Sequence, residues 1–301
     1  MRMKSRKEKL LDGLDLARAV GAEIGPLHNP LVSKLSGHVI YIDRADTESL
    51  RQHYANDPAV NTKDICVDAV WGVHTLAESI EIYFSKSGGA PQALDYVVAS
   101  HVIEHVPDLV SWLQEIRSIL KSDGEVRLAV PDRRFTFDYL RRPSNLSDVM
   151  TAYASKARIP TTHCLLDFCL NVIPVDSVAA WQGTLDTTSL KRGHTLEGAL
   201  SIARDALENG TYHDVHCWVF TPTSFAALFA ELSRLGLIDF ACGDFYDTQV
   251  NDIEFIVNMR VCDNAFERTN SWHHMSELLQ GKTSARAATR PNTREAELAL
   301  E

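Results

Sequence analysis

The chain has 301 residues, of which 45% are hydrophobic and 23% are charged. This composition is ordinary for a globular protein, and it excludes the collagen-like, disordered and small disulfide-rich classes. The net charge of −10 repels the phosphate backbones of DNA and RNA, so we expect no nucleic-acid partner.

The cysteines and the hydropathy pattern predict a cytoplasmic protein. The six cysteines include no C-x-x-C pair and fit reduced thiols. The basic N-terminus is followed by a leucine pair, not by the apolar core of a signal peptide. No apolar run approaches the length of about 18 residues that a membrane-spanning helix needs, so we expect no membrane partner. The sequence leaves the oligomeric state open.

The first half of the chain alternates strand and helix patterns. Five strands are predicted, at residues 22–24, 38–42, 65–70, 96–99 and 126–130. Between the last two, apolar residues from Leu109 to Leu120 recur at spacings of four, three and four, which predicts an amphipathic helix. Asp108 is its expected N-cap, and residues 122–124 (S-D-G) are expected to end it. Repeated strand–helix–strand units predict a doubly wound, Rossmann-like α/β sheet, mostly parallel, with helices on both faces.

The second half is less regular. Residues 141–215 are interpreted as a lid-like insertion, with a helix over residues 196–208. Regular patterns return with a helix beginning at Thr221 and with two strands at 240–246 and 254–261, which we expect to form an antiparallel pair at the sheet edge. Residues 263–301 are polar and are predicted to be a mostly disordered tail. One domain therefore spans residues 1–262, with its core at 15–140 and 216–262.

Residues at the carboxyl ends of the predicted strands are the candidate ligand contacts, because ligands of doubly wound sheets bind there. An acid that ends the second strand, Asp43, can accept hydrogen bonds from both hydroxyls of a ribose. An acid after the first or the third strand can receive an amino group. The sequence contains neither G-x-G nor a P-loop motif, which argues against dinucleotide and nucleoside-triphosphate cofactors. The array favours a nucleoside that carries a cationic amino-acid arm.

Two stretches resemble a known family. Residues 95–132 (DYVVASHVIEHVPDLVSWLQEIRSILKSDGEVRLAVPD) are similar to the fourth strand, the following helix and the fifth strand of class I S-adenosylmethionine (SAM)-dependent methyltransferases. Residues 23–26 (E-I-G-P) resemble that family's first motif in a short form, and residues 221–229 and 254–261 resemble its last helix and antiparallel edge strand. The resemblance implies SAM as the cofactor and methyl transfer as the reaction.

The resemblance also implies which residues contact SAM. Glu23 and Gly25 would face its methionine part, Asp43 would bind the ribose and Asp68 would lie near the adenine. The implied floor beneath the sulfonium is the pair Ser100 and His101. The residues alone also allow other interpretations: a buried acid satisfied by backbone N–H groups at position 23, and solvated loop acids at positions 43 and 68.

Three histidines are candidate general bases: His101, His105 and His216. Residues 101–105 also match the H-x-x-E-H pattern of some zinc proteases, but Pro107 and the preceding strand leave little room for the helix that this pattern requires, so a metal hydrolase is only a third hypothesis. A related E-x-x-E-H block in some O-methyltransferases binds a divalent ion. Because His101 stands where those enzymes have a glutamate, we favour a site without a metal; the sequence leaves a divalent ion at this block open. Histidines 213 and 216 are the ends of an H-D-V-H cluster. Its histidines either supply a base or a substrate contact, or stand at the start of a strand and form hydrogen bonds with the backbone.

The expected function is methylation of a small molecule by a SAM-dependent methyltransferase, and we favour O-methylation of a sugar or glycan precursor. The arginine pairs at 133–134 and 141–142 are interpreted either as an anion clamp or as partners in ion pairs. The first motif keeps a single glycine, followed by Pro26. That departure leaves a second hypothesis, a non-catalytic SAM- or S-adenosylhomocysteine (SAH)-binding or scaffold protein on the same fold.

Overall fold

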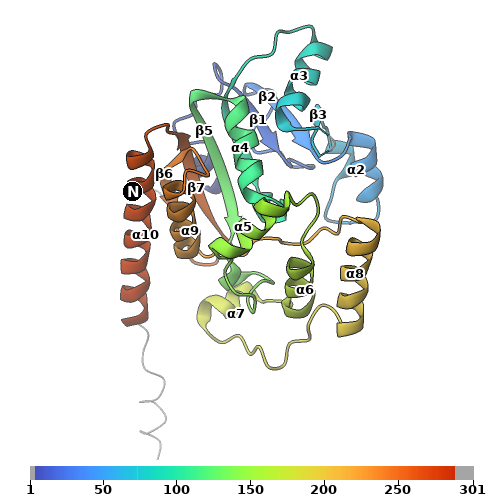
Figure 1. The fold of residues 1–301 in the computed structure, drawn as a ribbon, viewed down its shortest axis with the longest axis vertical. Coiled ribbons are helices and arrows are strands. Elements are labelled where there is room, and N and C mark those ends of the chain that lie inside the picture. The colour runs from blue at the N-terminus through green and yellow to red at the C-terminus, as the bar shows by residue number, and fades with distance from the viewer. Residues whose placement is uncertain (1–3, 73, 289–301) are drawn as a thin grey trace, which may run out of the picture.

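The computed structural model describes residues 4–72 and 74–288, and these residues contain one seven-stranded sheet (Figure 1). Its strands in chain order are β1 (Val20–Ile24), β2 (His38–Asp43), β3 (Ala69–Val70), β4 (Leu94–Ser100), β5 (Leu120–Pro131), β6 (Phe240–Tyr246) and β7 (Glu254–Val261). Their order across the sheet is β3-β2-β1-β4-β5-β7-β6. Strands β1 to β5 pair in parallel, whereas β7 is antiparallel to both β5 and β6. The predicted fold class and its antiparallel edge are confirmed.

The βαβ unit at the centre of the sheet forms as its sequence predicts. Helix α4 (Leu109–Ile119) begins at Asp108, whose carboxylate accepts a hydrogen bond from the Ser111 backbone N–H at 3.0 Å. The helix buries the apolar stripe that the spacing predicts. It ends earlier than predicted, because β5 begins directly at Leu120 and includes residues 122–124.

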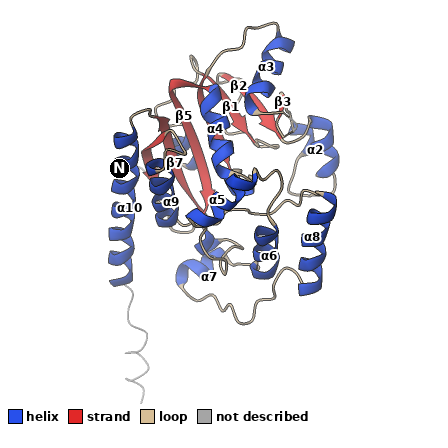
Figure 2. Ribbon diagram, in the orientation of Figure 1, coloured by secondary structure: helices blue, strands red, loops and turns tan. Residues whose placement is uncertain are grey.

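Most helices cover one face of the sheet. Alternate strand residues on this face, such as Ile24, Ile42 and Leu128, form the larger apolar core with helices α3 (Leu76–Ser87), α4, α9 (Pro222–Arg234) and α10 (Ala265–Ala288). Figure 2 shows α4 and α9 in front of the strands. Helix α2 (Thr47–His53) and the 3-10 helices η1 (Thr62–Asp64), η2 (Ile103–His105) and η3 (Arg133–Phe135) lie in the connections.

The opposite face has a thinner cover. Short helix α1 (Arg6–Leu10) and the connection between β1 and β2 pack on it, with Leu10, Leu31 and Val32 against Tyr41 and Tyr96. This connection, residues 25–37, contains neither helix nor strand. The crossover after β1 is therefore a loop that lies on the sheet.

The segment interpreted as an insertion is helical. It contains α5 (Leu146–Ser155), α6 (Thr162–Asn171), α7 (Ser177–Gln182) and α8 (Leu196–Asn209), the last close to the predicted helix. In Figure 1, helices α6, α7 and α8 lie beyond the end of the sheet toward which β5 runs. In a parallel sheet that end is where ligands bind. None of the helices in the described ranges combines the length and apolar composition needed to cross a bilayer.

The prediction of a disordered tail from residue 263 is wrong for residues 265–288. Helix α10 occupies them and packs on α9 and β6. Its Trp272 is fully buried, and the Trp272 indole N–H donates to the Phe240 carbonyl at 2.8 Å. Tertiary packing thus orders a segment whose own sequence is polar. Residues 289–301 lie outside the described residues.

Candidate active site

Four of the predicted cofactor contacts lie at three neighbouring strand ends. Gly25 follows β1, Asp43 ends β2, and Ser100 and His101 stand at the end of β4. Because β1 pairs with both β2 and β4, these ends are adjacent. The connections leave β1 and β4 toward opposite sides at this point, which is the topological switch point where such sheets bind ligands.

Gly25 makes the turn after β1 with a backbone that favours glycine. Its φ is +68°, and its N–H donates to the Ile42 carbonyl at 2.8 Å. A Cβ at this position would stand 2.7 Å from Val102 Cγ2. The turn therefore needs a residue without a side chain, because Val102 already fills the space beside it.

Gly25→Ala should lower the free energy of unfolding by about 2–4 kcal/mol, because a positive φ costs about 1–2 kcal/mol and forced contact with Val102 adds about 1–3 kcal/mol. Gly236→Ala is the matched control, since Gly236 has φ +69° and open space around its Cβ position. Urea unfolding of both variants measures the difference. Equal losses of unfolding free energy in the two variants would show that the turn after β1 accommodates a methyl group beside Val102.

Asp43 presents a half-buried carboxylate at the end of β2. Within residues 4–72 and 74–288, the hydrogen bond that it accepts comes from the neighbouring Arg44 backbone N–H, at 2.7 Å. Burial raises the pKa of Asp43, and this hydrogen bond offsets only part of the effect. The Arg44 guanidinium lies over the Tyr212 ring at 5.7 Å, which brings the end of the insertion next to Asp43.

Glu23 and Asp68 have other partners. Both oxygens of the buried Glu23 carboxylate accept backbone N–H groups, from Leu31 at 2.7 Å and from Val32 at 2.9 Å. These contacts agree with the alternative interpretation of Glu23, a buried acid whose oxygens are satisfied by backbone N–H groups. Asp68 precedes β3 instead of following it, which corrects the predicted strand at 65–70. Its carboxylate accepts the Tyr41 N–H at 2.8 Å and pairs with Lys34 Nζ at 2.6 Å, so each oxygen already has a partner within the domain.

His101 is a non-glycine residue with φ +53° and stands directly beyond β4. Its Nε2 lies 2.7 Å from Glu254 Oε2, and Arg6 bonds both Glu254 and the Ser100 hydroxyl. Burial lowers the pKa of His101, but the bond to Glu254 and the nearby charge of Glu104 prevail and raise it. Burial raises the pKa of Glu254, yet its bonds with His101 and Arg6 bring it down to about 2.

His105 and His216 meet across a short gap, with ring centroids 4.7 Å apart. His105 Nδ1 lies 2.9 Å from Asp214 Oδ1, and this bond lowers the pKa of Asp214 to about 2. Burial lowers the pKa of His105, but Asp214 and Glu104 raise it further, so the net shift is upward. His216 Nδ1 lies 2.6 Å from Asp138 Oδ2. All three predicted histidines are thus brought together, each beside a carboxylate.

The zinc-protease interpretation is excluded by the local backbone. Residues 103–105 form only the short 3-10 helix η2, and α4 begins at Leu109. The two histidines of the H-x-x-E-H pattern therefore do not share a helix, which that class of protease requires.

Comparison with known protein families shows which family the chain belongs to. A family model described as a methyltransferase domain matches residues 16–232. The chain belongs to this family. Its mostly parallel sheet with an antiparallel edge is the fold that the sequence resemblance implies.

Solved structures share parts of this architecture at low identity. They include one described as a Zn-dependent alcohol dehydrogenase from Rhodobacter sphaeroides (12% identity, 86% of this chain and 91% of that chain, TM-score 0.44). Two others are an S-adenosylmethionine-dependent methyltransferase from Mesorhizobium loti (11%, 82% and 93%, TM-score 0.40) and the CcbJ methyltransferase from Streptomyces caelestis (9%, 85% and 94%, TM-score 0.42). None of the curated proteins matches the chain.

Sequence reasoning about this methyltransferase domain did not assign the residues that orient the histidines. Glu104 stands inside the H-x-x-E-H block and Asp214 inside the H-D-V-H cluster, so both were visible as neighbours of candidate histidines. Asp138 and Glu254 reach the site from distant segments, which spacing does not reveal. His213, the other histidine of that cluster, pairs instead with Asp205 at 2.8 Å.

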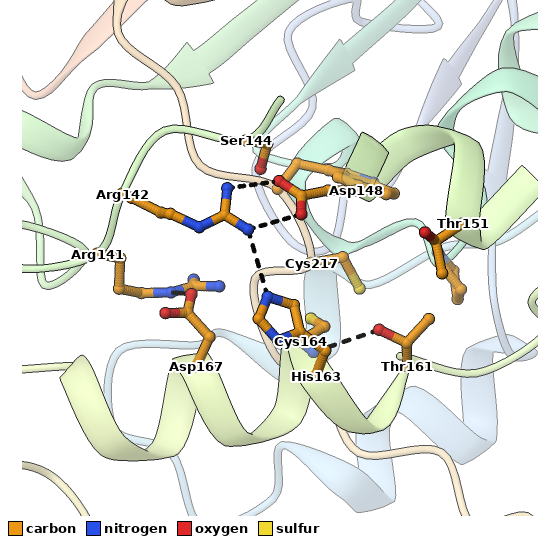
Figure 3. A pocket seen from close by; sticks show the side chains of 12 residues that line it. Arg141, Arg142, Ser144, Asp148, Thr151, Thr161, His163, Cys164, Asp167 and Cys217 are labelled. Atoms are coloured by element: carbon orange, nitrogen blue, oxygen red, sulfur yellow. Dashed lines mark hydrogen bonds and ion pairs between the residues drawn. The ribbon is translucent and has the colours of Figure 1, made fainter. Parts of the chain in front are cut away.

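A small cavity of about 130 Å³ lies inside the insertion of the methyltransferase domain, between α5 and α6 (Figure 3). None of the predicted catalytic or cofactor-binding residues lines it. Figure 3 shows Arg142 directed toward Asp148, which accepts two hydrogen bonds from it at 2.6 and 2.7 Å. Arg141 pairs with Asp138 and Asp167. These contacts favour the ion-pair interpretation of this arginine pair.

Proposed function

We propose that this methyltransferase domain transfers a methyl group from SAM to a small-molecule acceptor, and we favour a hydroxyl group of a sugar or glycan precursor. The observation that carries the proposal is the arrangement of strand ends in a member of this family: the glycine turn after β1, the carboxylate after β2 and the histidine after β4 are adjacent. The net charge of −10 supports a small acceptor over a nucleic acid. The six unpaired cysteines support a cytoplasmic location.

The residues present fit a nucleoside with an amino-acid arm. The half-buried Gly25 presents backbone without a side chain at the end of β1, where a Cβ would meet Val102. The half-buried Asp43 carboxylate has acceptor capacity left for ribose hydroxyls. When bound, SAM supplies an electrophilic methyl group on its sulfonium.

The chain's own residues then position the acceptor and take its proton. The side chains of His101 and His105 are 35% and 32% exposed, so an acceptor hydroxyl can reach them, whereas that of His216 is 8% exposed. A carboxylate behind each ring fixes its orientation, as in other His–carboxylate pairs. The segment at 212–216 closes this side of the site through the bond between Asp214 and His105. Holding the reactants aligned away from water is the protein's main contribution to such a displacement.

One observation favours the alternative of a non-catalytic SAM- or SAH-binding or scaffold protein. The turn directly after β1 has one glycine, Gly25, and the loop that follows lies on the sheet, anchored by Glu23 at residues 31 and 32. A chain of this kind would bind SAM without turning it over. Measuring SAH formation in the presence of candidate acceptors separates the two functions once binding is established.

Asp43→Ala should weaken SAM and SAH binding by about 1.5–3 kcal/mol, the value of a charge-assisted hydrogen bond, which is about 10-fold to 150-fold in Kd. Titration calorimetry of the purified chain with each ligand measures this change. In the wild type, SAH affinity should also fall at acidic pH, by up to about tenfold per pH unit. This loss begins above the usual aspartate range, because burial raises the pKa of Asp43.

Glu48→Ala is the matched control for this substitution, because it removes an exposed carboxylate from α2, five residues away. Its ligand affinity should equal that of the wild type. An unchanged affinity in Asp43→Ala would contradict the ribose assignment. Absence of binding by the wild type at millimolar SAM and SAH would overturn the proposed function.

A further inference from the structure

Glu104 is a buried carboxylate that no hydrogen bond satisfies in the described part of the chain. It is 0% exposed, and neither of its carboxylate oxygens has a hydrogen-bond partner there. Burying an ionised carboxylate without compensation is strongly unfavourable. The proposed methyl transfer gives this buried side chain no role, and its surroundings point to a missing partner.

Three imidazole nitrogens surround Glu104 Oε1. His101 Nδ1 lies at 3.5 Å, and the Nε2 atoms of His105 and His216 each lie at 3.9 Å. These separations are too long for hydrogen bonds. Ligand atoms that share one ion through bonds of about 2.0–2.2 Å stand about 3.0–3.5 Å apart. The ligand atoms of Glu104, His105 and His216, which lie within 4.8 Å of one another, would therefore move together by up to about 1.5 Å when an ion binds.

The backbone holds this cluster in place. The Glu104 carbonyl accepts the N–H groups of Cys217 at 2.5 Å and Trp218 at 3.1 Å. These bonds attach the end of the insertion to η2 and bring His216 beside Glu104. One ligand atom each from Glu104, His105 and His216 lies within 4.8 Å of the others.

The far nitrogen of each ring is bound to a different carboxylate. His105 Nδ1 bonds Asp214, His216 Nδ1 bonds Asp138, and His101 Nε2 bonds Glu254, at 2.9, 2.6 and 2.7 Å. A carboxylate that accepts the N–H of one ring nitrogen leaves the lone pair of the other nitrogen directed at Glu104. Carboxylate–histidine pairs of this kind are the usual outer support of metal-binding histidines.

We propose that Glu104, His105 and His216 bind one divalent ion of the first transition row, such as Zn²⁺, Fe²⁺ or Co²⁺. Two imidazoles with one carboxylate suit these ions, whereas Mg²⁺ and Ca²⁺ prefer oxygen ligands. The 32% exposed side chain of His105 leaves one side of the site open. The proposal departs from the metal-free site that the sequence favours. It rests on side-chain geometry and does not require that the chain bind SAM.

The test uses the full untagged chain, stripped with a chelator that is then removed. Titration with Zn²⁺ by calorimetry and with Co²⁺ by visible absorption should give one equivalent bound, with a Kd of about 1 μM or tighter and cobalt d–d bands typical of nitrogen and oxygen ligands. Thermal unfolding should shift upward with added Zn²⁺, because an ion that binds only the folded chain stabilises it. SAH binding measured on the stripped chain reports separately on the proposed function.

Glu104→Gln and His105→Gln should each weaken metal binding by at least about a hundredfold, and Asp214→Asn by about 10-fold to 100-fold. His105→Gln is the second variant because the partly exposed His105 ring can be replaced with less risk to the fold than the buried Glu104. Circular dichroism checks that each variant is folded. His213→Gln is the matched control and should bind like the wild type, because His213 pairs with Asp205 away from the cluster. Absence of one-to-one binding in the wild type, or binding unchanged in folded Glu104→Gln and His105→Gln, would overturn the proposal.

Discussion

Trp272→Ala should lower the free energy of unfolding by about 3–5 kcal/mol, the usual loss when a fully buried large aromatic side chain is truncated. The Trp272 side chain is 0% exposed, and its ring centroid lies 5.0 Å from that of Phe229 on α9. The substitution also removes the hydrogen bond to the Phe240 carbonyl on β6. Urea unfolding followed by circular dichroism measures the loss.

Phe266→Ala is the control on the same helix, because the Phe266 side chain is 77% exposed. Its effect should stay within about 0.5 kcal/mol of the wild type. Trp272→Phe should fall between the two, since it keeps most of the packing and loses the hydrogen bond. Similar small losses for Trp272→Ala and Phe266→Ala would mean that α10 does not pack on the domain in solution.

Helix α10 shows where sequence patterning stops being informative. Its buried contacts come from few residues, including Trp272 and Leu279, within a segment that is otherwise polar. An amphipathic stripe is visible in a sequence only when several turns of a helix contribute to it. Here α9 and β6 supply the apolar partners, and those lie outside the segment itself. The prediction of disorder therefore followed from local composition and failed through tertiary packing.

The opposite case is the unit β4–α4–β5. Helix α4 has an apolar residue on its buried face at every turn and an Asp108 side chain that caps its first turn. Local propensity, periodicity and capping agree there, so the sequence alone was sufficient. The predicted strand at 65–70 failed because only residues 69–70 pair with β2. An apolar run does not reveal how many of its residues lie alongside a neighbouring strand.

The candidate site also contains residues that the sequence predicts and residues that it does not. The histidines after β4 and the carboxylate after β2 were predictable, because strand ends of a parallel sheet meet at one edge. Their partners Asp138, Asp214 and Glu254 come from three other segments. Only the folded chain brings these carboxylates to the rings. Sequence spacing therefore predicts the chemistry-bearing residues more readily than the groups that orient them.

Glu23→Ala should lower the free energy of unfolding by about 3 kcal/mol. The two hydrogen bonds that Glu23 accepts, from Leu31 and Val32, are each worth about 1.5–3 kcal/mol as bonds to a charged group, and removing a buried charge recovers part of their sum. These bonds fix the loop that follows the Gly25 turn. The variant should therefore also bind SAH more weakly, through a change in the shape of the loop.

Glu23→Gln separates the shape of this side chain from its charge. The amide oxygen can accept one of the two N–H groups while the amide nitrogen faces the other, so we expect a smaller loss of about 1–2 kcal/mol. Burial raises the pKa of Glu23 despite its two backbone hydrogen bonds, so the folded chain binds this proton more readily than the unfolded chain. The resulting stabilisation is complete below the ordinary glutamate range and disappears as pH rises through the raised pKa.

The difference in unfolding free energy between the wild type and Glu23→Gln should therefore decrease as pH rises across that window, which urea titrations at a series of pH values measure. A loop anchor predicts that stability and SAH affinity change together in both Glu23 variants. A direct cofactor contact predicts the opposite pattern, with SAH binding lost in Glu23→Gln while the unfolding free energy and its pH dependence match the wild type. Because both Glu23 oxygens are taken by Leu31 and Val32, the first pattern is the one we expect.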